Sequence, residues 1–446
     1  MATGKKRFLL ALTAILLAAL FNQEADAVPA FARQTGLACV ACHVSFPELT
    51  PFGRFFKLTG YTLTNYRTIP LAAMVQSSIT STRTIDQNNY DFVRDKDFVP
   101  LQQVSLFYGG RIAGPVGAFA QVTYDGVAHH GALDNTDIRA AWHFTQQDVD
   151  FIFGVTVNNN PTVSDVWNST PAFGFPYASS SVSVPPLAGA LIDGGLAQQV
   201  MGVGAYVFWQ RHIYAELGMY RTADQMFSVF RAGQDTGTPG GVARLRGENP
   251  YWRLAYNQEW GPNSLMIGTY GMIADRYPDN TIPGTPTDRF SDYALDAQYQ
   301  FITLSNAFSV QATWIHEKQN WGASYASGGI GAGPTPSNPS DNLNTLKVKA
   351  SYYYLRKYGA TLAYFSTTGT ADPGLYAPAP VTGSANGLPD TRGLIFEVDY
   401  LPVPQAKLSL QYTWYLAFNG AKSNYDGNGR NASDNNFLYM SGWFVF

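Results

Sequence analysis

The two cysteines of this 446-residue chain stand close together, in the order Cys39, Val40, Ala41, Cys42, His43. C-x-x-C followed directly by His is the attachment signature of a c-type haem. The two thiols bond covalently to the vinyl groups of the haem, and the adjacent imidazole ligates its iron. The sequence therefore predicts one haem c, attached through Cys39 and Cys42, with His43 as the proximal iron ligand.

Two other roles are open for these cysteines. Two cysteines in an exported protein can form a single disulfide. A C-x-x-C pair whose thiols are exposed can also act as a redox dithiol. The cysteine count, the spacing and the expected export favour haem attachment.

Export is expected because residues 1–27 have the features of a secretion signal. Residues 5–7 are basic, residues 8–21 are apolar but too few to span a bilayer, and residues 25–27 (Ala-Asp-Ala) form a small-residue cleavage site. The remaining chain has 26 basic and 30 acidic residues, a net charge of −4. This balance gives no basic surface for nucleic acid.

Aromatic and basic side chains surround the motif. The aromatic ones can pack on a porphyrin, and the basic ones can either neutralise its propionates or contact acidic groups that line a pore. The residues concerned are Phe31, Phe46, Phe52, Phe55 and Phe56, and Arg33, Arg54 and Lys57. No further His or Met lies between His43 and Tyr66. A sixth iron ligand must therefore come from elsewhere in the chain, from water or from a less usual side chain.

The composition of the whole chain favours a membrane β-barrel. Only 14% of the residues are charged, whereas 46% are hydrophobic; an ordinary globular domain has about 25% charged residues. The mean hydropathy is nevertheless slightly negative, at −0.12, which a bundle of membrane helices would not give. A barrel wall that is apolar on one face and polar on the other explains both values.

From about residue 69 onward, apolar residues alternate with polar or small ones at period two, most clearly in residues 265–273 and 308–314. Such alternation is expected of a lipid-facing wall around a wet interior. We predict about sixteen strands. Their centres lie near Val75, Leu106, Ala120, Ala140, Val155, Ala205, Leu217, Leu254, Thr269, Leu295, Ala312, Ala350, Leu362, Glu397, Gln411 and Met440.

Seven short connections alternate with longer ones rich in Gly, Pro, Ser, Asn and Asp, of which the longest covers residues 158–196. Short periplasmic turns that alternate with long external loops are typical of outer-membrane barrels. The final residues 438–446 end in an aromatic, Phe446, and resemble the C-terminal assembly signal of bacterial outer-membrane proteins. Several tryptophans suit interfacial girdles, namely Trp142, Trp209, Trp252, Trp260, Trp314, Trp321 and Trp443.

A family resemblance rests on the segment around the haem motif. Its residues are 29–36 (Pro-Ala-Phe-Ala-Arg-Gln-Thr-Gly), the C-x-x-C-H motif, 47–49 (Pro-Glu-Leu), 52–54 (Phe-Gly-Arg), Lys57 and 60–61 (Gly-Tyr). Together with the barrel pattern, they resemble the fused monohaem cytochrome-porins of the outer membrane, a family that includes the extracellular iron oxidases of iron-oxidising bacteria. The motifs cover roughly a tenth of the chain after the signal, and the barrel matches only in pattern.

The resemblance implies that Fe(II) is oxidised outside the cell and that electrons pass inward to periplasmic c-type cytochromes. The chain would then be an Fe(II):cytochrome c oxidoreductase that acts as an electron conduit. A diffusion porin whose haem-bearing segment is a plug or sensor is the alternative.

We therefore predict an all-β, outer-membrane, antiparallel barrel with three parts. These parts are a signal peptide (1–27), a haem segment that plugs the barrel (28–66) and the barrel itself (67–446).

Candidates for the remaining iron ligands are scattered along the chain. By inward parity Met74, His143, Met266 and Met272 are candidates for the distal haem ligand, whereas His316 shares the lipid-facing parity of Trp314. For donor iron, the external loops offer oxygen and imidazole ligands, although solvated loop charge also explains these residues. They are Asp86, Asp91, Asp95 and Asp97 in the first loop, and Asp125, His129, His130 and Asp134 in the second.

Overall fold

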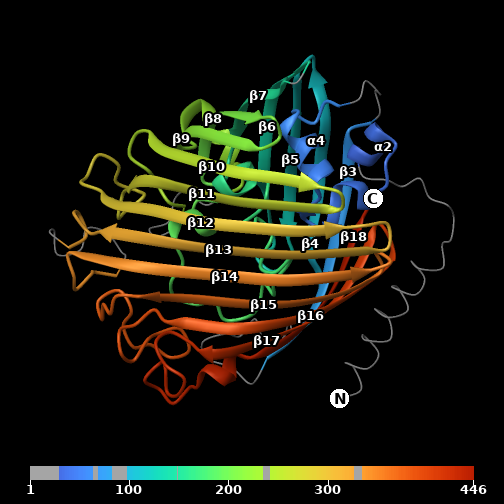
Figure 1. Ribbon diagram of the computed structural model, residues 1–446. Helices are drawn as coiled ribbons and strands as arrows, with labels where there is room; N and C mark the ends of the chain where they lie inside the picture. The colour runs from blue at the N-terminus through green and yellow to red at the C-terminus, as the bar shows by residue number, and fades with distance from the viewer. Residues whose placement is uncertain (1–29, 64–68, 83–97, 148, 235–241, 326–333) are drawn as a thin grey trace.

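The chain folds into a closed barrel of sixteen antiparallel strands, in which each strand pairs with its neighbours in sequence and β18 pairs with β3 (Figure 1). The computed structural model describes residues 30–63, 69–82, 98–147, 149–234, 242–325 and 334–446. The expected signal peptide and its cleavage site lie outside these residues. The predicted fold class is confirmed.

Every predicted strand centre falls within one observed strand. The strands are β3 (Leu71–Thr82), β4 (Phe98–Ala113), β5 (Val116–Asp125), β6 (His130–Gln146), β7 (Val149–Asn158), β8 (Val200–Trp209), β9 (Ile213–Thr222), β10 (Asn249–Trp260), β11 (Asn263–Arg276), β12 (Asp288–Ile302), β13 (Asn306–Asn320), β14 (Ser340–Tyr354), β15 (Tyr358–Gly369), β16 (Thr391–Val403), β17 (Ala406–Ala417) and β18 (Phe437–Val445).

The period-two pattern places polar residues inside and apolar residues outside, because successive side chains of a strand point to opposite faces. In β13, Ser309 and Gln311 are buried inside the barrel, while Trp314 is exposed outside. Large apolar side chains are exposed on many strands, for example Leu254, Ile267, Leu295, Leu362, Val398 and Met440.

A closed barrel with an apolar outer face leaves no strand edge unpaired in lipid. The chain is therefore a porin-like outer-membrane barrel in contact with lipid, as predicted. No helix in the described ranges has the length and apolar character that a membrane span requires.

All seven short connections lie at one end of the barrel. The first barrel strand, β3, begins at this end, and the last, β18, finishes there. By the rule for outer-membrane barrels this short-turn end faces the periplasm.

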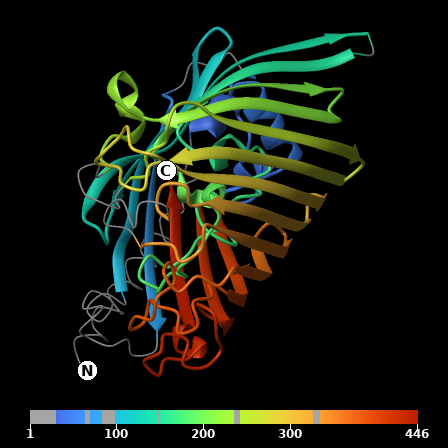
Figure 2. The same cartoon turned by 90° about the vertical axis from the view of Figure 1, so that its left-hand side faces the viewer.

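The segment before the barrel folds into three short helices and a small hairpin. These elements are α2 (Ala30–Thr35), α3 (Cys39–Cys42), β1 (His43–Ser45), β2 (Glu48–Leu49) and α4 (Pro51–Leu58). The helices lie within the ring of strands near the C-terminus (Figure 2). Their wall contacts are with residues close to the short turns, such as Ser264 and Gln300.

The longest connection, residues 159–199, does not extend outward as an external loop. It carries α6 (Pro161–Ser164) and η1 (Leu191–Gly195) and runs through the barrel interior, as the green segment of Figure 2 shows. Its hydrogen bonds to inward side chains of the wall include Gln311 to Trp167 O, Tyr177 to Ser351, Gln411 to Ala178 O, and Leu191 N to Glu317. We call it the inner loop.

Candidate haem-attachment site

The C-x-x-C-H motif forms one helical turn followed by a short strand. In α3 the two cysteines are three residues apart and therefore lie on the same side of the turn. His43 then leaves the helix with an extended backbone, at φ −123° and ψ 138°. Thr50 supports the turn from below, because its hydroxyl donates to Ala41 O at 2.6 Å and its backbone N–H donates to Cys42 O at 2.9 Å.

Close packing of α4 against this turn requires a glycine. Gly53 lies so near the turn that a Cβ atom on it would come within 2.2 Å of Cys42 O. The Gly53 N–H also donates to Thr50 Oγ1 at 3.1 Å, which caps α4. The Phe-Gly-Arg stretch of the sequence therefore has a packing role directly beneath the motif.

Both cysteines and His43 line a mainly apolar cavity that is partly open to solvent. The N-terminal segment forms one side of the cavity, and the inner loop and strands β3, β4, β5 and β18 form the rest. Its wall residues on the barrel include Met74, Phe107, Phe119 and Trp443. Its lining suits an apolar group. Trp443 thus lies inside the barrel, and its prediction as a girdle residue is wrong.

Burial sets the protonation of the motif. It raises the pKa of Cys39, and it raises the pKa of Cys42 to about 11, so both unbonded thiols are protonated at neutral pH. Burial also lowers the pKa of His43 to about 4, although contacts with the backbone of Pro47 and Glu48 oppose this shift. The buried Nδ1 atom of His43 has no hydrogen-bond partner of standard geometry in the described chain. A neutral imidazole is the form that ligates iron.

Two further observations concern the disulfide and redox-dithiol roles of the cysteines. The thiols are not joined in a disulfide. A redox dithiol needs an exposed thiol with a lowered pKa, whereas Cys39 is buried and the pKa of each thiol is raised.

The phenylalanines predicted to pack on a porphyrin divide between two places. Phe31, Phe46 and Phe56 line the motif's cavity, and the Phe46 ring lies 5.1 Å from the His43 ring. Phe52 and Phe55 line a different hollow on the other side of α4. For these two residues the structure gives no contact with the cavity.

The three cations expected to face propionates or acidic groups also have different surroundings. Arg33 donates to the backbone carbonyl of Leu71. Lys57 lines the cavity, donates to the carbonyl of Val163 and lies 3.8 Å from Asp137. Burial lowers the pKa of Lys57 to about 8, although the nearby carboxylate of Asp137 opposes this shift.

Arg54 is held by neutral groups rather than by carboxylates. Its guanidinium donates to Gln298, Gln300 and Ser264 at 2.9–3.0 Å. Of the three cations, therefore, only Lys57 lines the cavity, and its carboxylate neighbour fits the acidic-pore interpretation.

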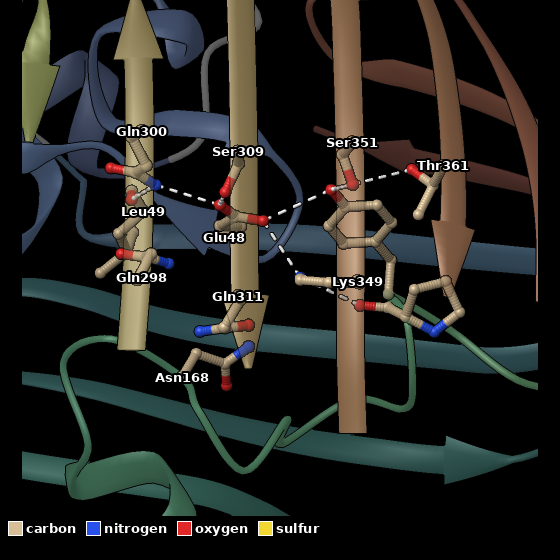
Figure 3. Close-up of polar contacts among 12 residues, drawn as sticks. Glu48, Leu49, Asn168, Gln298, Gln300, Ser309, Gln311, Lys349, Ser351 and Thr361 are labelled. Carbon is tan, nitrogen blue, oxygen red and sulfur yellow. Dashed lines mark hydrogen bonds and ion pairs between the residues drawn. The ribbon is translucent and has the colours of Figure 1, made fainter. Parts of the chain in front are cut away.

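Glu48 anchors the segment to the opposite wall, as Figure 3 shows. It accepts hydrogen bonds from Ser309, from Gln300 at 3.0 Å and from Tyr177 at 3.3 Å, and it pairs with Lys349 at 3.0 Å. Burial raises the pKa of Glu48, but the Lys349 ammonium and the hydrogen bonds outweigh this effect and hold it below its usual value. The Pro-Glu-Leu stretch that contains Glu48 does not by itself reveal this anchoring role.

Only one candidate for the distal haem ligand lies at the cavity. Met74 is 1% exposed and lines it. The other candidates lie elsewhere: Met266 and Met272 belong to two different buried clusters, and His143 pairs with Asp150 at 2.7 Å. His316, which was not a candidate, stacks on Trp314.

The candidate ligands for donor iron that fall within the described residues do not gather into a site. In the described ranges no group of three or more His, Cys, Asp or Glu side chains is placed to hold a metal ion. Asp125 accepts from the backbone N–H groups of Val127 and Ala128, while Asp134 accepts from Thr123 at 2.8 Å. The four aspartates of the first loop, residues 86, 91, 95 and 97, lie outside the described residues.

No protein-family model and no curated protein matches this chain. Solved structures with a similar fold include OmpT of Vibrio cholerae, 11% identical over 84% of this chain and 96% of that chain, with a TM-score of 0.42. The outer membrane channel DcaP of Acinetobacter baumannii is 10% identical over 84% and 96%, with a TM-score of 0.43. Salmonella typhi OmpF in complex with daunomycin is 10% identical over 84% and 97%, with a TM-score of 0.41. Likeness this remote assigns neither a ligand nor an activity.

Proposed function

We propose that this barrel carries one covalent haem c inside its periplasmic end and transfers electrons, with extracellular Fe(II) as donor and periplasmic c-type cytochromes as acceptors. The observation that carries the proposal is the apolar cavity onto which Cys39, Cys42 and His43 all face. The two thiols would hold the haem, and neutral His43 would ligate its iron. The bound haem would supply one-electron exchange.

The residues of the chain have three tasks in this function. Phe31, Phe46 and Phe56 line the cavity with apolar surface, which would tune the redox potential of the bound haem. Glu48 and Arg54 fix the segment against the wall. In the net reaction one Fe(II) loses an electron and becomes Fe(III), and one acceptor cytochrome gains that electron.

The position of the cavity supports the choice of acceptor. Its barrel-wall residues, among them Ala72, Gly109 and Val445, lie within about a third of a strand of the short-turn end. A periplasmic cytochrome that docks at this end approaches the motif closely. An extracellular donor is farther from the motif than the acceptor is, because the inner loop occupies the external side of the barrel interior.

A diffusion porin is the second candidate, and the porin-like architecture of the barrel favours it. Against it, the inner loop bonds to strands on several sides of the lumen, including Thr80 on β3, Gln311 on β13 and Gln411 on β17. These contacts leave the loop across the route that a solute would take.

The test uses the full chain, produced with a haem-attachment system and purified in detergent. We expect a c-type haem spectrum, haem that remains on the denatured chain, and its reduction by Fe(II) at neutral pH without oxygen. A double variant, Cys39→Ser with Cys42→Ser, should fold as a barrel but lose covalent haem.

Two results would overturn parts of this proposal. Covalent haem that dithionite reduces and Fe(II) does not would remove the iron assignment alone. Solute flux through liposomes that is equal with and without haem, with no electron transfer to enclosed cytochrome c, would establish the porin instead.

A further inference from the structure

We infer that the thioether sulfur of Met74 is the sixth ligand of the haem iron. This inference rests on the proposed function, because it requires the haem to be attached at Cys39 and Cys42. It concerns a residue of the barrel wall, more than thirty residues beyond His43 in the sequence. The haem site would then be shared between the N-terminal segment and the first barrel strand.

The cavity offers few atoms that can ligate iron. Apart from the motif itself, the lining side chains in the described chain with a ligating N, O or S atom of suitable strength are Lys57, Tyr61, Met74 and Asp165. His43 is the only histidine among the lining residues. Among the described residues that line the cavity, one of these four side chains would supply the ligand.

Three of the four are engaged elsewhere. Lys57 donates to Val163 O and lies against Asp137. The Tyr61 hydroxyl donates to Asp137 at 2.6 Å. Asp165 accepts from two backbone N–H groups, at 2.9 and 2.7 Å, and lies 3.5 Å from the buried guanidinium of Arg253. Ligation by any of them would break a buried charge-assisted contact, which is costly.

Met74 makes no charge-assisted contact of this kind. Its sulfur has one weak contact, from the Gln76 amide at 3.9 Å, and thioether sulfur is a poor hydrogen-bond acceptor. The side chain is 1% exposed, so water does not compete for the sulfur. A soft, neutral sulfur that is shielded from water and makes only one weak contact suits a haem iron. Met with His is an established axial pair in c-type haems.

Barrel closure fixes the position of Met74. In the register of the last and first strands Met74 lies opposite Val445, and Ala73 exchanges two backbone hydrogen bonds with Phe446, at 3.1 and 2.8 Å. Val445 and Trp443 line the same cavity. The wall that carries the sulfur is therefore set by the seam between the two ends of the barrel, and haem ligation would report on correct closure.

The experiment compares Met74→Leu with Met266→Leu in the haem-loaded full chain. Met266 is also 1% exposed and points inward, but it packs in a different cluster. Leucine conserves volume at both sites, so both variants should fold. The readouts are the sulfur-to-iron charge-transfer band of the oxidised protein, carbon monoxide binding to the reduced protein, and the midpoint potential.

We expect the band in the parent chain, its loss in Met74→Leu together with faster carbon monoxide binding and a lower midpoint potential, and no change in Met266→Leu. Met74→His should restore a six-coordinate, low-spin spectrum without the sulfur band. The inference is wrong if the haem-loaded parent lacks the band, or if Met74→Leu keeps it. A parent chain without covalent haem would instead overturn the proposed function, so the two failures are distinguishable.

Discussion

The N-terminal segment meets opposite environments on its two sides. On one side Phe31, Phe46 and Phe56 face the apolar cavity with the haem motif. On the other side Glu48 and Arg54 are buried among amides, hydroxyls and the Lys349 ammonium of the barrel wall. The apolar side forms one wall of the cavity. The polar side fixes the position of the segment against the barrel wall. A buried charge that leaves its partners loses several kcal/mol, so the polar contacts specify one docked arrangement.

Under the proposed function, this difference also explains why the segment can be short. A c-type haem site needs apolar walls on both faces of the ring, and about 32 residues from Ala30 to Tyr61 are too few to build them alone. The barrel supplies the missing wall through Met74, Phe119 and Trp443. Segment and barrel together line one cavity.

The largest effect is expected on the polar side. Glu48→Gln leaves the Lys349 ammonium buried without its partner, so we expect the docked segment to lose about 3–5 kcal/mol. Protease protection of the segment in urea measures this. Adding Lys349→Met should recover part of the loss, since the buried ammonium is then removed. The control is Glu248→Gln, which breaks an exposed pair with Arg221 of similar length, 3.2 Å, and should cost about 0–1 kcal/mol. Equal costs for the two single variants would contradict the anchoring role of Glu48.

A smaller effect is expected where the two sides meet. Gly53→Ala places a methyl group against Cys42 O, which must displace α4 from the motif at a cost of about 1–3 kcal/mol. We expect less covalent haem per chain, measured by the ratio of haem absorbance to protein. Gly189→Ala is the control, because nothing lies within 4 Å of a Cβ atom there. Full haem content in Gly53→Ala would show that the packing is looser than described.

The smallest effects are expected from changes to single aromatic rings on the two sides of the segment. Phe46→Leu removes an aromatic contact with His43, worth about 0.5–1.5 kcal/mol, and should shift the haem absorption bands. Phe52→Leu changes a ring that is 38% exposed and faces away from the cavity, so stability should change by no more than about 0.5 kcal/mol. Absorption spectra and urea midpoints of both variants test this order, and a band shift in Phe52→Leu alone would reverse it.

The sequence by itself determined the barrel. Strand alternation is a local property, because successive side chains of a strand point to opposite faces whatever the strand pairs with. The inward Gln311 and the outward Trp314 could therefore be assigned from their neighbours alone. The seven short turns followed from local composition. The haem roles predicted for Cys39, Cys42 and His43 depend on their spacing within five residues, and they stay predictions.

Only the tertiary structure decided what surrounds the motif. The inner loop has the composition of an external loop, and its inward course depends on partners such as Gln311 and Glu317, more than 100 residues away. Met74 reaches the cavity because β3 pairs with β18 at the other end of the chain. The same closure turns Trp443 inward. Contacts of such sequence separation are set by the closing of the barrel, and no local pattern of residues records them.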